Sequence, residues 1–518
     1  MRLNQHWVVY SGILLAAFIL AANFPITIDE AYYIAFSKNL QLSYVDHPPF
    51  VSYLNLAQSM FGLTSPLFNR LLVIMTHLIA TLFLLAIVYN HCEKDEDLAT
   101  KLLVTFLIAY VVPIFGMYSI IILPDTGLIL SLSMMLWAAD KVVLANELSW
   151  RNAFELGIGL GIGMLAKYHI LPLGGGILFG VLLDLSLRST FMWSNLAKLV
   201  ASLAIGLMCA LPVFIWNWDN HFASFMFQLQ HGFRSDTLHP MAILSFIYGS
   251  VFYLTPWFAF ILLKQGLFSK KHWHLLIPVC SLVIILLISS ARKHVLSHWV
   301  SPAFWLLIPY AVIYSSHRKR YLSLLMKMCK YTALLWLVFI AVMLLPAERL
   351  AIKQIGKIPH VNPIIFVGSS FWEELPEMIQ KNAVLADIVD KALHQKPNSG
   401  CAKKNPIVGT YRWFWASQLE YHQMFPGAQI LNLELNSSNF YLWRDDWSDY
   451  ANCNILLIGE ETQNITSELA QILKVNHEYT LHGLGDYPAL NLKVISATLD
   501  DSNTIKNVQQ SLLAHPHY

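Results

Sequence analysis

Long apolar runs fill the first two thirds of the chain and recur at the length that a helix needs to cross a bilayer. About 20 apolar residues span the hydrocarbon of a membrane as a helix. The pattern predicts about eleven spans, or up to 13 if neighbouring runs are divided differently. The predicted spans are residues 7–23, 67–90, 99–118, 122–144, 152–168, 170–187, 196–215, 243–264, 273–290, 300–315 and 328–345.

The chain becomes polar after residue 346, and this change divides it into two parts. Residues 347–518 carry 31 of the 66 charged side chains. Helix-like stretches at Trp372–Val389 and Thr466–Lys474 are mixed with strand-like ones, which predicts a small α/β domain. The strand-like stretches are Pro363–Val367, Gln429–Leu435, Asn454–Ile458 and Leu490–Ile495. We therefore expect a transmembrane domain at 1–346 and a soluble domain at 347–518.

Composition and charge agree with a polytopic membrane protein. Hydrophobic residues make up 56% of the chain and charged residues 13%, with a mean hydropathy of +0.51. These values exclude an ordinary soluble enzyme and a disordered chain. The net charge of +2 gives no reason to expect a nucleic-acid partner. If the N-terminus is cytoplasmic, 15 of the 21 Lys and Arg residues before position 347 face inward, which places the polar tail outside.

The six cysteines are scattered and include no CxxC pair, so they indicate no redox or metal site. Cys401 and Cys453 are candidates for a disulfide if the tail faces an oxidising compartment. A divalent metal is neither required nor indicated, and no cofactor is expected. Four glycines at two-residue spacing, Gly157, Gly159, Gly161 and Gly163, predict close helix packing inside the membrane.

Three outward segments are longer than a simple connection needs: residues 24–66, 216–242 and 291–299. The first contains two apolar stretches of helical spacing, Asp29–Leu40 and Pro49–Phe61, that suit the membrane surface. It also carries adjacent carboxylates, Asp29 and Glu30, and later Asp46-His47 before two prolines. This pattern indicates titratable groups at the membrane surface, although a hydrated loop with a helix-capping Asp is an alternative.

Ionisable residues also interrupt two apolar runs. Asp125 stands at the outer end of the run 122–144, and Lys167-Tyr168-His169 follows the outward end of the run 152–168. Such residues usually face a polar cavity. A capping Asp and a snorkelling Lys are the alternatives.

The remaining outward segments carry histidines and cations. His221, Gln228 and His231 lie among aromatic residues, which could also form an interfacial belt. The last outward hairpin holds the three residues Arg292, Lys293 and His298. Cations that face outward against the topological bias indicate an anionic partner, and a phosphate is the obvious one.

At these residues the sequence resembles the bacterial branch of the polytopic protein O-mannosyltransferase superfamily, which includes the lipid A aminoarabinose transferase and the rhizobial galacturonosyltransferases. Single motifs are weak, but the set recurs in order over residues 29–299. The matching pieces are Asp29-Glu30-Ala31-Tyr32-Tyr33, Tyr44-x-Asp46-His47-Pro48-Pro49, Pro124-Asp125, Lys167-Tyr168, Trp216-Asn217 with His221, Ser224-Phe225-x-Phe227-Gln228, His231-Gly232 and His298-Trp299. The tail motif Tyr411-Arg412 with Ala416-Ser417-Gln418-Leu419 resembles the family's periplasmic domain more loosely.

The resemblance implies a GT-C fold in the bacterial inner membrane and a periplasmic reaction. That reaction is an inverting sugar transfer from a polyprenyl-phosphate donor to lipid A or another lipopolysaccharide, a glycan or a protein. Asp29 maps to the family's proposed catalytic base, supported by Glu30, with Asp125 as a further catalytic candidate. The aminoarabinose branch has a lysine where this chain has His47, so we expect Lys167, Arg292 and Lys293 to contact the donor phosphate instead.

Two other classes of protein remain as alternatives. A transporter or flippase of lipid-linked sugars would also have many spans and buried charges. It predicts charges at mid-bilayer in both halves and needs no large outer domain, whereas the polar cues here gather on one face. A catalytically silent scaffold is the third alternative, and the presence of Asp29 and Asp125 counts against it.

Overall fold

The computed structural model describes residues 2–60, 65–187, 193–233, 240–264, 272–292, 295–315, 319–344, 371–434, 446–460, 465–484 and 487–514. Contacts between residues divide the chain into two compact units. The first unit comprises Met1–Asn23 and Leu42–Ala341, and the second comprises Phe24–Gln41 and Val342–Tyr518. A short segment near the N-terminus therefore belongs to the same unit as the polar tail.

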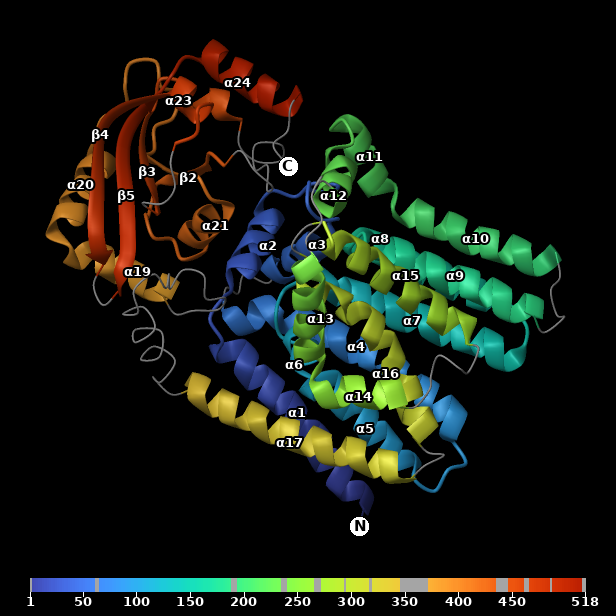
Figure 1. Cartoon of the computed structure of the whole chain (residues 1–518). Coiled ribbons are helices and arrows are strands. Elements are labelled where there is room, and N and C mark those ends of the chain that lie inside the picture. Colours follow the sequence, from blue (N-terminus) through green and yellow to red (C-terminus); the bar gives the residue numbers. More distant parts are fainter. Residues whose placement is uncertain are drawn as a thin grey trace. The chain divides into compact units, whose positions relative to one another are not determined.

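The described secondary-structure elements of the first unit are all helices (Figure 1). Its helices are α1 (Arg2–Asn23), α3 (Phe50–Ser59), α4 (Pro66–Cys92), α5 (Leu98–Val111), α6 (Pro113–Tyr118), α7 (Pro124–Ala145), α8 (Trp150–Ala166), α9 (Ile170–Leu187), α10 (Trp193–Cys209), α11 (Leu211–Asp219), α12 (Ala223–Phe233), α13 (Pro240–Leu254), α14 (Pro256–Lys264), α15 (Trp273–Ser290), η2 (Ser297–Val300), α16 (Ser301–Ser315) and α17 (Lys319–Leu344). Each of the eleven predicted apolar runs coincides with one of these helices or with a consecutive pair.

Among the described residues, six helices are long and apolar enough to cross a membrane, and up to eight spans result if two bent pairs each count as one. The six are His6–Asn23, Pro66–Cys92, Pro124–Ala145, Ile170–Leu187, Trp273–Ser290 and Arg320–Val338. The bent pairs are α10 with α11, at 53°, and α13 with α14, at 97°. A proline follows each break, at Pro212 and Pro256, and ends the preceding helix because it donates no backbone hydrogen bond. The protein is thus a multi-pass membrane protein.

Close packing of α8 against its neighbours confirms the prediction from the alternating glycines. A Cβ added at Gly157 or Gly161 would lie within 3 Å of atoms of α10, and one at Gly159 or Gly163 would meet α7 in the same way. The four glycines therefore serve two opposite faces of α8. Elsewhere α9 packs on α15 and α4 packs on α7. These helices hold the polar residues described below.

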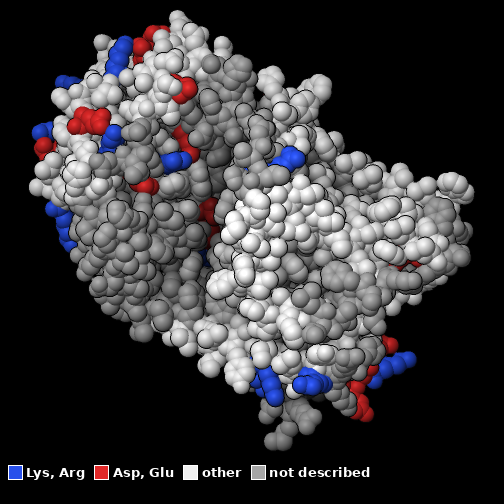
Figure 2. Space-filling view, in the orientation of Figure 1, with Lys and Arg blue, Asp and Glu red and all other residues white. Residues whose placement is uncertain are grey.

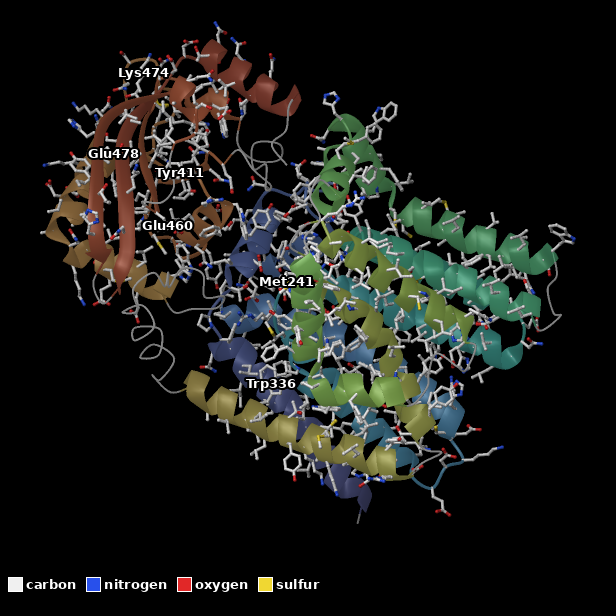
Figure 3. All side chains as sticks on the ribbon, in the orientation of Figure 1. Met241, Trp336, Tyr411, Glu460, Lys474 and Glu478 are labelled. Atoms are coloured by element: carbon white, nitrogen blue, oxygen red, sulfur yellow. A yellow bond between two sulfur atoms is a disulfide. The ribbon has the colours of Figure 1, made fainter. Side chains whose placement is uncertain are left out.

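The surface of the helical unit suits a lipid environment. In Figure 2 most of the visible surface of this unit lacks Lys, Arg, Asp and Glu, whereas the second unit shows both signs of charge. Large apolar side chains are exposed along α17, including Leu334, Leu335 and Val338. On the same helix the indole of Trp336, labelled in Figure 3, donates a hydrogen bond of 2.7 Å to the carbonyl of Val111. Such exposure is costly in water and favourable in a bilayer.

The second unit contains a five-stranded sheet with the order β2-β1-β3-β5-β4 (Figure 1). β1 pairs in parallel with β2 and β3, whereas β5 runs antiparallel to β3 and β4. Its elements are α2 (Ile28–Lys38), α19 (Phe371–Lys381), α20 (Ala383–His394), β1 (Ile407–Thr410), α21 (Trp413–Tyr421), β2 (Gln429–Asn432), η4 (Trp447–Tyr450), β3 (Asn454–Glu460), α23 (Leu469–Ile472), β4 (Leu473–Leu484), β5 (Tyr487–Leu499) and α24 (Ser502–Ala514).

The strands divide their side chains between two cores. On β3, Leu456 and Ile458 belong to one core and Ile455 and Leu457 to the other, as the two-residue period of a strand requires. Helices α19, α20 and α21 cover the first face, and η4, α23 and α24 cover the second. Helices on both faces of a sheet define a three-layer α/β domain.

The structure confirms the α/β class of the tail and alters its details. Three predicted strands overlap β2, β3 and β5, whereas Pro363–Val367 lies outside the described residues. The prediction of a helix at Thr466–Lys474 holds only for the short α23, and the strand β4 follows it directly. Cys401 and Cys453 are joined in a disulfide.

Candidate functional site

A buried ion pair forms the centre of the candidate site in the helical unit. Asp125 lies in the first turn of α7, and Lys167 lies directly after the last residue of α8. Lys167 Nζ is 2.8 Å from Asp125 Oδ2, and the two residues are 6% and 3% exposed. The other carboxylate oxygen, Oδ1, has no hydrogen-bond partner among the described residues. The pair can therefore accept a further donor, and the ammonium group retains further N–H donors of its own.

Two histidines lie near this pair, on segments that connect helices. The charges of Lys167 and Asp125 act on both His169 and His298. Burial lowers the pKa of His169 to about 3 and that of His298 to about 4, and Lys167 acts in the same direction. Both imidazoles are therefore neutral at neutral pH. Neither ring makes a hydrogen bond within the described residues; His169 contacts Trp299 instead, with ring centroids 5.9 Å apart.

Tyr168 extends the site to helix α12. Its hydroxyl forms a hydrogen bond with Ser224 on α12, and its ring packs edge-on against Phe225 at 5.8 Å. Burial raises the pKa of Tyr168, so the hydroxyl keeps its proton. Asn217 on α11 accepts a hydrogen bond from the Phe225 backbone at 3.3 Å, which orients the start of α12. The predicted motif around Trp216 and Ser224 thus holds Tyr168 in place.

Asp46 and His47 belong to a turn before α3. The backbone N–H of Tyr44 donates to the carbonyl of His47 at 3.2 Å, and the two prolines that follow lead into the helix. Gln228 Nε2 donates to the backbone carbonyl of Asp46 at 2.8 Å, which joins α12 to this turn. The charge of His47 also acts on His169. Asp46, His47, Gln228 and Tyr168 are therefore brought to the same region as Lys167.

Asp29 and Glu30 lie in the second unit, in the first turn of α2. Glu30 is fully buried, and its carboxylate accepts a hydrogen bond of 3.0 Å from the backbone N–H of Thr27. Thr27 in turn accepts one of 3.1 Å from the N–H of Glu30. This capping box fixes the start of the helix and thereby the position of Asp29, which is half-buried.

The other predicted residues are less informative. His221 is exposed, and both it and Phe222 have a positive φ, of 54° and 59°, between α11 and α12. Such a conformation is uncommon for side chains of this size. Arg292 is exposed at the end of α15. His231 lies on α12, but its side chain is outside the described residues, as is Lys293 entirely.

Two residues near the ion pair, Tyr118 and Ser301, were not predicted from the sequence. The hydroxyl of Tyr118, from α6, forms a hydrogen bond of 2.6 Å with Ser301 at the start of α16 and also interacts with Asp125. Tyr118 ends a predicted apolar run, where a tyrosine carries no functional signal. Within the described residues, no group of three or more His, Cys, Asp or Glu is arranged to hold a metal ion.

A second buried polar cluster, which we call the clamp cluster, lies at the opposite ends of the same helices. It consists of His91 on α4, Asp140 on α7, Asp184 on α9, His274 on α15 and Tyr310 on α16. These residues form one chain of hydrogen bonds from Asp184 through His274 and Tyr310 to Asp140 and His91, with distances of 2.6, 2.9, 2.7 and 2.8 Å in that order.

Known proteins are similar to the chain in fold and, over part of its length, in sequence. Residues 46–216 match the family model of dolichyl-phosphate-mannose-protein mannosyltransferases. The crystal structure of ArnT from Cupriavidus metallidurans bound to undecaprenyl phosphate is similar with a TM-score of 0.58 and 14% identity, over 95% of this chain and 98% of that one. The apo form gives a TM-score of 0.57 and 12% identity, over 96% and 98%. No curated protein sequence matches the chain.

These findings define a polytopic protein with the GT-C fold, as the resemblance of the motifs implied. The similarity extends over nearly the whole length of both chains, including the C-terminal α/β domain. The family match includes Asp46 and His47 together with Asp125 and Lys167. The fold and the family match together indicate a membrane glycosyltransferase of the GT-C type.

Proposed function

We propose that the protein transfers a sugar, with inversion, from a polyprenyl-phosphate donor to an acceptor of the cell envelope on the periplasmic side of the bacterial inner membrane. The acceptor is lipid A or another lipopolysaccharide, a glycan or a protein. The observation that carries the proposal is the buried Asp125–Lys167 pair, which lies beside two neutral imidazoles in a GT-C fold. The undecaprenyl phosphate bound to ArnT supports the lipid class of the donor.

Lys167 suits recognition of the donor phosphate. Asp125 accepts one N–H group of Lys167 and holds the ammonium in place. The remaining N–H donors of Lys167 can bind phosphate oxygens. Because the pair itself is neutral, a phosphate also needs uncompensated positive charge, which Arg292 and Lys293 supply in this proposal. The neutral rings of His169 and His298 add hydrogen bonds without charge, and His47 contributes a third imidazole to the set. His221, Gln228 and His231 complete the donor-binding set.

The reaction needs one general base and one leaving group. The acceptor oxygen bonds to the anomeric carbon on the face opposite the phosphate, and the bond between that carbon and the phosphate oxygen breaks. Its electron pair leaves with the polyprenyl phosphate, and the Asp29 carboxylate takes the proton of the acceptor hydroxyl. Glu30 supports this role by capping α2. No step requires a metal or another cofactor.

The disulfide between Cys401 and Cys453 supports the orientation, because such bonds persist in oxidising compartments. The excess of Lys and Arg on the other side of the predicted spans agrees with a cytoplasmic N-terminus. In this proposal the second unit is periplasmic.

The test is a transfer assay with purified protein, radiolabelled undecaprenyl-phosphate sugars and an envelope acceptor fraction. Wild-type protein moves label to the acceptor, and Asp29→Asn lowers the rate by a factor of about 10² or more, as expected for loss of a general base. Asp387→Asn, at an exposed carboxylate on α20, is the matched control and keeps the wild-type rate. Full activity of Asp29→Asn would refute the mechanism.

A transporter of lipid-linked sugars is the second candidate, and the clamp cluster favours it. Buried ionisable residues mark ion and substrate pathways in transporters, and here they occur in a second cluster as well as at the Asp125–Lys167 pair. Reconstituted vesicles distinguish the two functions. Movement of lipid-linked sugar across the vesicle membrane, with no transfer from any donor, would replace the transferase by the transporter.

A further inference from the structure

The second unit holds the helix that carries the proposed catalytic base. Helix α2 lies almost 400 positions before α21 in the sequence, yet the two pack together within one compact unit. Ile28, directly before Asp29, packs against the core formed by α19, α20, α21 and one face of the sheet. The position of Asp29 is therefore set by the α/β domain.

Three side-chain contacts connect α2 with α21. Along α2, they lie just before its start, in its middle and at its end. Gln418 Nε2 donates to the backbone carbonyl of Ile26, two residues before the helix, at 3.4 Å. The rings of Tyr32 and Trp413 pack with centroids 4.8 Å apart. At the far end Lys38 Nζ lies 3.0 Å from Glu420 Oε1. Contacts spread along both helices fix both the position of α2 and its direction.

The start of α21 is itself fixed by the sheet. The backbone N–H of Trp413 donates to the carboxylate of Glu434, which follows β2 and is 4% exposed. Arg412 Nη1 lies 3.6 Å from the same carboxylate. A negative charge at a helix N-terminus is favourable, so Glu434 stabilises α21 where it meets α2. A continuous set of contacts thus leads from the sheet to Asp29.

We propose that α21 is the positioning element of the catalytic base, with Trp413 and Glu420 as positioning residues that act on the reaction through α2. This inference rests on the proposed function, since it assumes that Asp29 takes the acceptor proton. Proton transfer requires the two heavy atoms within hydrogen-bond reach. A displacement of about 1 Å at a reacting group can lower the rate about 100-fold. Loosening α2 therefore lowers kcat, whereas the KM for the donor, which the helical unit binds, stays unchanged.

The first experiment removes the ring contact and then restores part of it. Trp413→Ala lowers kcat at least tenfold and changes the donor KM less than twofold, whereas Trp413→Phe keeps an aromatic ring and stays within about threefold of wild type. In an Asp29→Asn background, Trp413→Ala has no further effect, because no base remains to be misplaced. A wild-type kcat for Trp413→Ala, or an equal loss in both backgrounds, would overturn the proposal.

The second experiment reverses the charges of an ion pair at the surface of the second unit. Lys38 and Glu420 have side chains 50% and 20% exposed. Lys38→Glu and Glu420→Lys each lower kcat about threefold, and the double exchange returns it to within twofold of wild type. The same exchange of Asp387 and Lys391, an exposed pair within α20, is the control and leaves kcat unchanged. Failure of the double exchange to restore kcat would count against α21 as the positioning element.

The outcomes also separate this inference from the function on which it rests. Full activity of Asp29→Asn would refute both the assignment of Asp29 as the base and the positioning role of α21. If wild type is active and Asp29→Asn is inactive, normal kcat values for the Trp413, Lys38 and Glu420 variants remove only the positioning role.

Discussion

Helix α7 places a carboxylate inside the protein at each of its ends, and the surroundings of the two differ. Asp125 in the first turn pairs with Lys167, and Asp140, five residues before the end of the helix, accepts hydrogen bonds from Tyr310 and His91. The two carboxylates are 3% and 1% exposed, and each keeps one oxygen without a hydrogen-bond partner among the described residues. Burial and the unpartnered oxygen therefore do not distinguish the two sites.

The neighbouring imidazoles do distinguish them. His169 and His298 lie near Asp125, and their rings make no hydrogen bond within the described residues. His274 in the clamp cluster is bonded through both ring nitrogens, to Asp184 and Tyr310. Asp184 also accepts the backbone N–H groups of Trp273 and His274, which caps the start of α15. One end has donors and acceptors ready for a ligand, whereas the other uses them to join helices.

The largest difference is expected for the two carboxylates. Asp125→Asn leaves the buried Lys167 ammonium without its counter-charge and removes the group that orients it. We expect a loss of kcat/KM of at least 100-fold, in the range seen when a charge-stabilising group is removed. The free energy of unfolding also falls by about 3 kcal/mol, because a buried charge is left uncompensated. Asp140→Asn costs less, because the amide oxygen can still accept the hydrogen bonds from Tyr310 and His91, and it leaves the rate within about threefold of wild type.

A double substitution separates the two effects of Asp125. Asp125→Asn combined with Lys167→Gln removes both charges and returns most of the stability, but transfer stays at the level of the single variant. Thermal unfolding in detergent and the donor assay give the two values. Recovery of transfer in the double variant would show that Asp125 serves stability alone, and loss of transfer in Asp140→Asn would move the clamp cluster into the functional machinery.

The two tyrosines offer a smaller and more closely matched contrast. Tyr168→Phe removes the hydroxyl that meets Ser224, and Tyr310→Phe removes the one between His274 and Asp140. We expect Tyr168→Phe to lower transfer about fivefold with little change in stability. Tyr310→Phe should lower the free energy of unfolding by about 1 kcal/mol, typical of hydrogen bonds between membrane helices, and leave transfer unchanged.

Assay and thermal unfolding of both variants, side by side, check this contrast. The opposite assignment, with a transfer defect in Tyr310→Phe and a stability defect in Tyr168→Phe, would reverse the roles of the two ends.

The sequence predicted the helices and the polar residues at the Asp125 end of α7, but not the clamp cluster at the other end. Each predicted apolar run of membrane-spanning length is a helix or a pair of helices in the structure. This agreement is expected because a backbone in lipid must satisfy its hydrogen bonds internally. Asp125 and Lys167 were detectable because each interrupts such a run on the side that is predicted to face outward. Asp140 and Asp184 stand near the ends of runs that are predicted to face inward, where charged residues are ordinary, and gave no signal.

The clamp cluster and the packing of α2 on α21 depend on contacts between positions that are distant in the sequence. His274 and Asp184 are 90 residues apart, and α2 and α21 are separated by almost the whole helical unit. Residue types cannot reveal such pairings in a single sequence. Strand β4 was missed for a local reason, since its residues alternate polar and apolar only weakly beside the short α23.

The smallest expected effect concerns pH and two histidines outside the spans. Burial lowers the pKa of His298, near Asp125, to about 4, and that of His272, beside the clamp cluster, to about 4 as well. The unfolded chain binds a proton at each ring near pH 6.5 and the folded chain does not, so stability falls as the pH drops from about 6.5 toward 4. We expect His298→Asn and His272→Asn each to reduce this loss by on the order of 1 kcal/mol between pH 7 and pH 5.

His298→Asn and His272→Asn are expected to change the pH dependence of stability equally, but to differ in the rate of transfer at pH 7. His298 faces the ion pair as a neutral ring, so His298→Asn should lower transfer about threefold, whereas His272, whose ring bonds to Tyr314, should be replaceable without loss. Unfolding curves at pH 7 and pH 5, together with initial rates at pH 7, measure both effects. Equal rates for the two variants would mean that the imidazole beside Asp125 is as structural as the one at the other end, and the contrast between the two ends of α7 would then rest on the Lys167 pair alone.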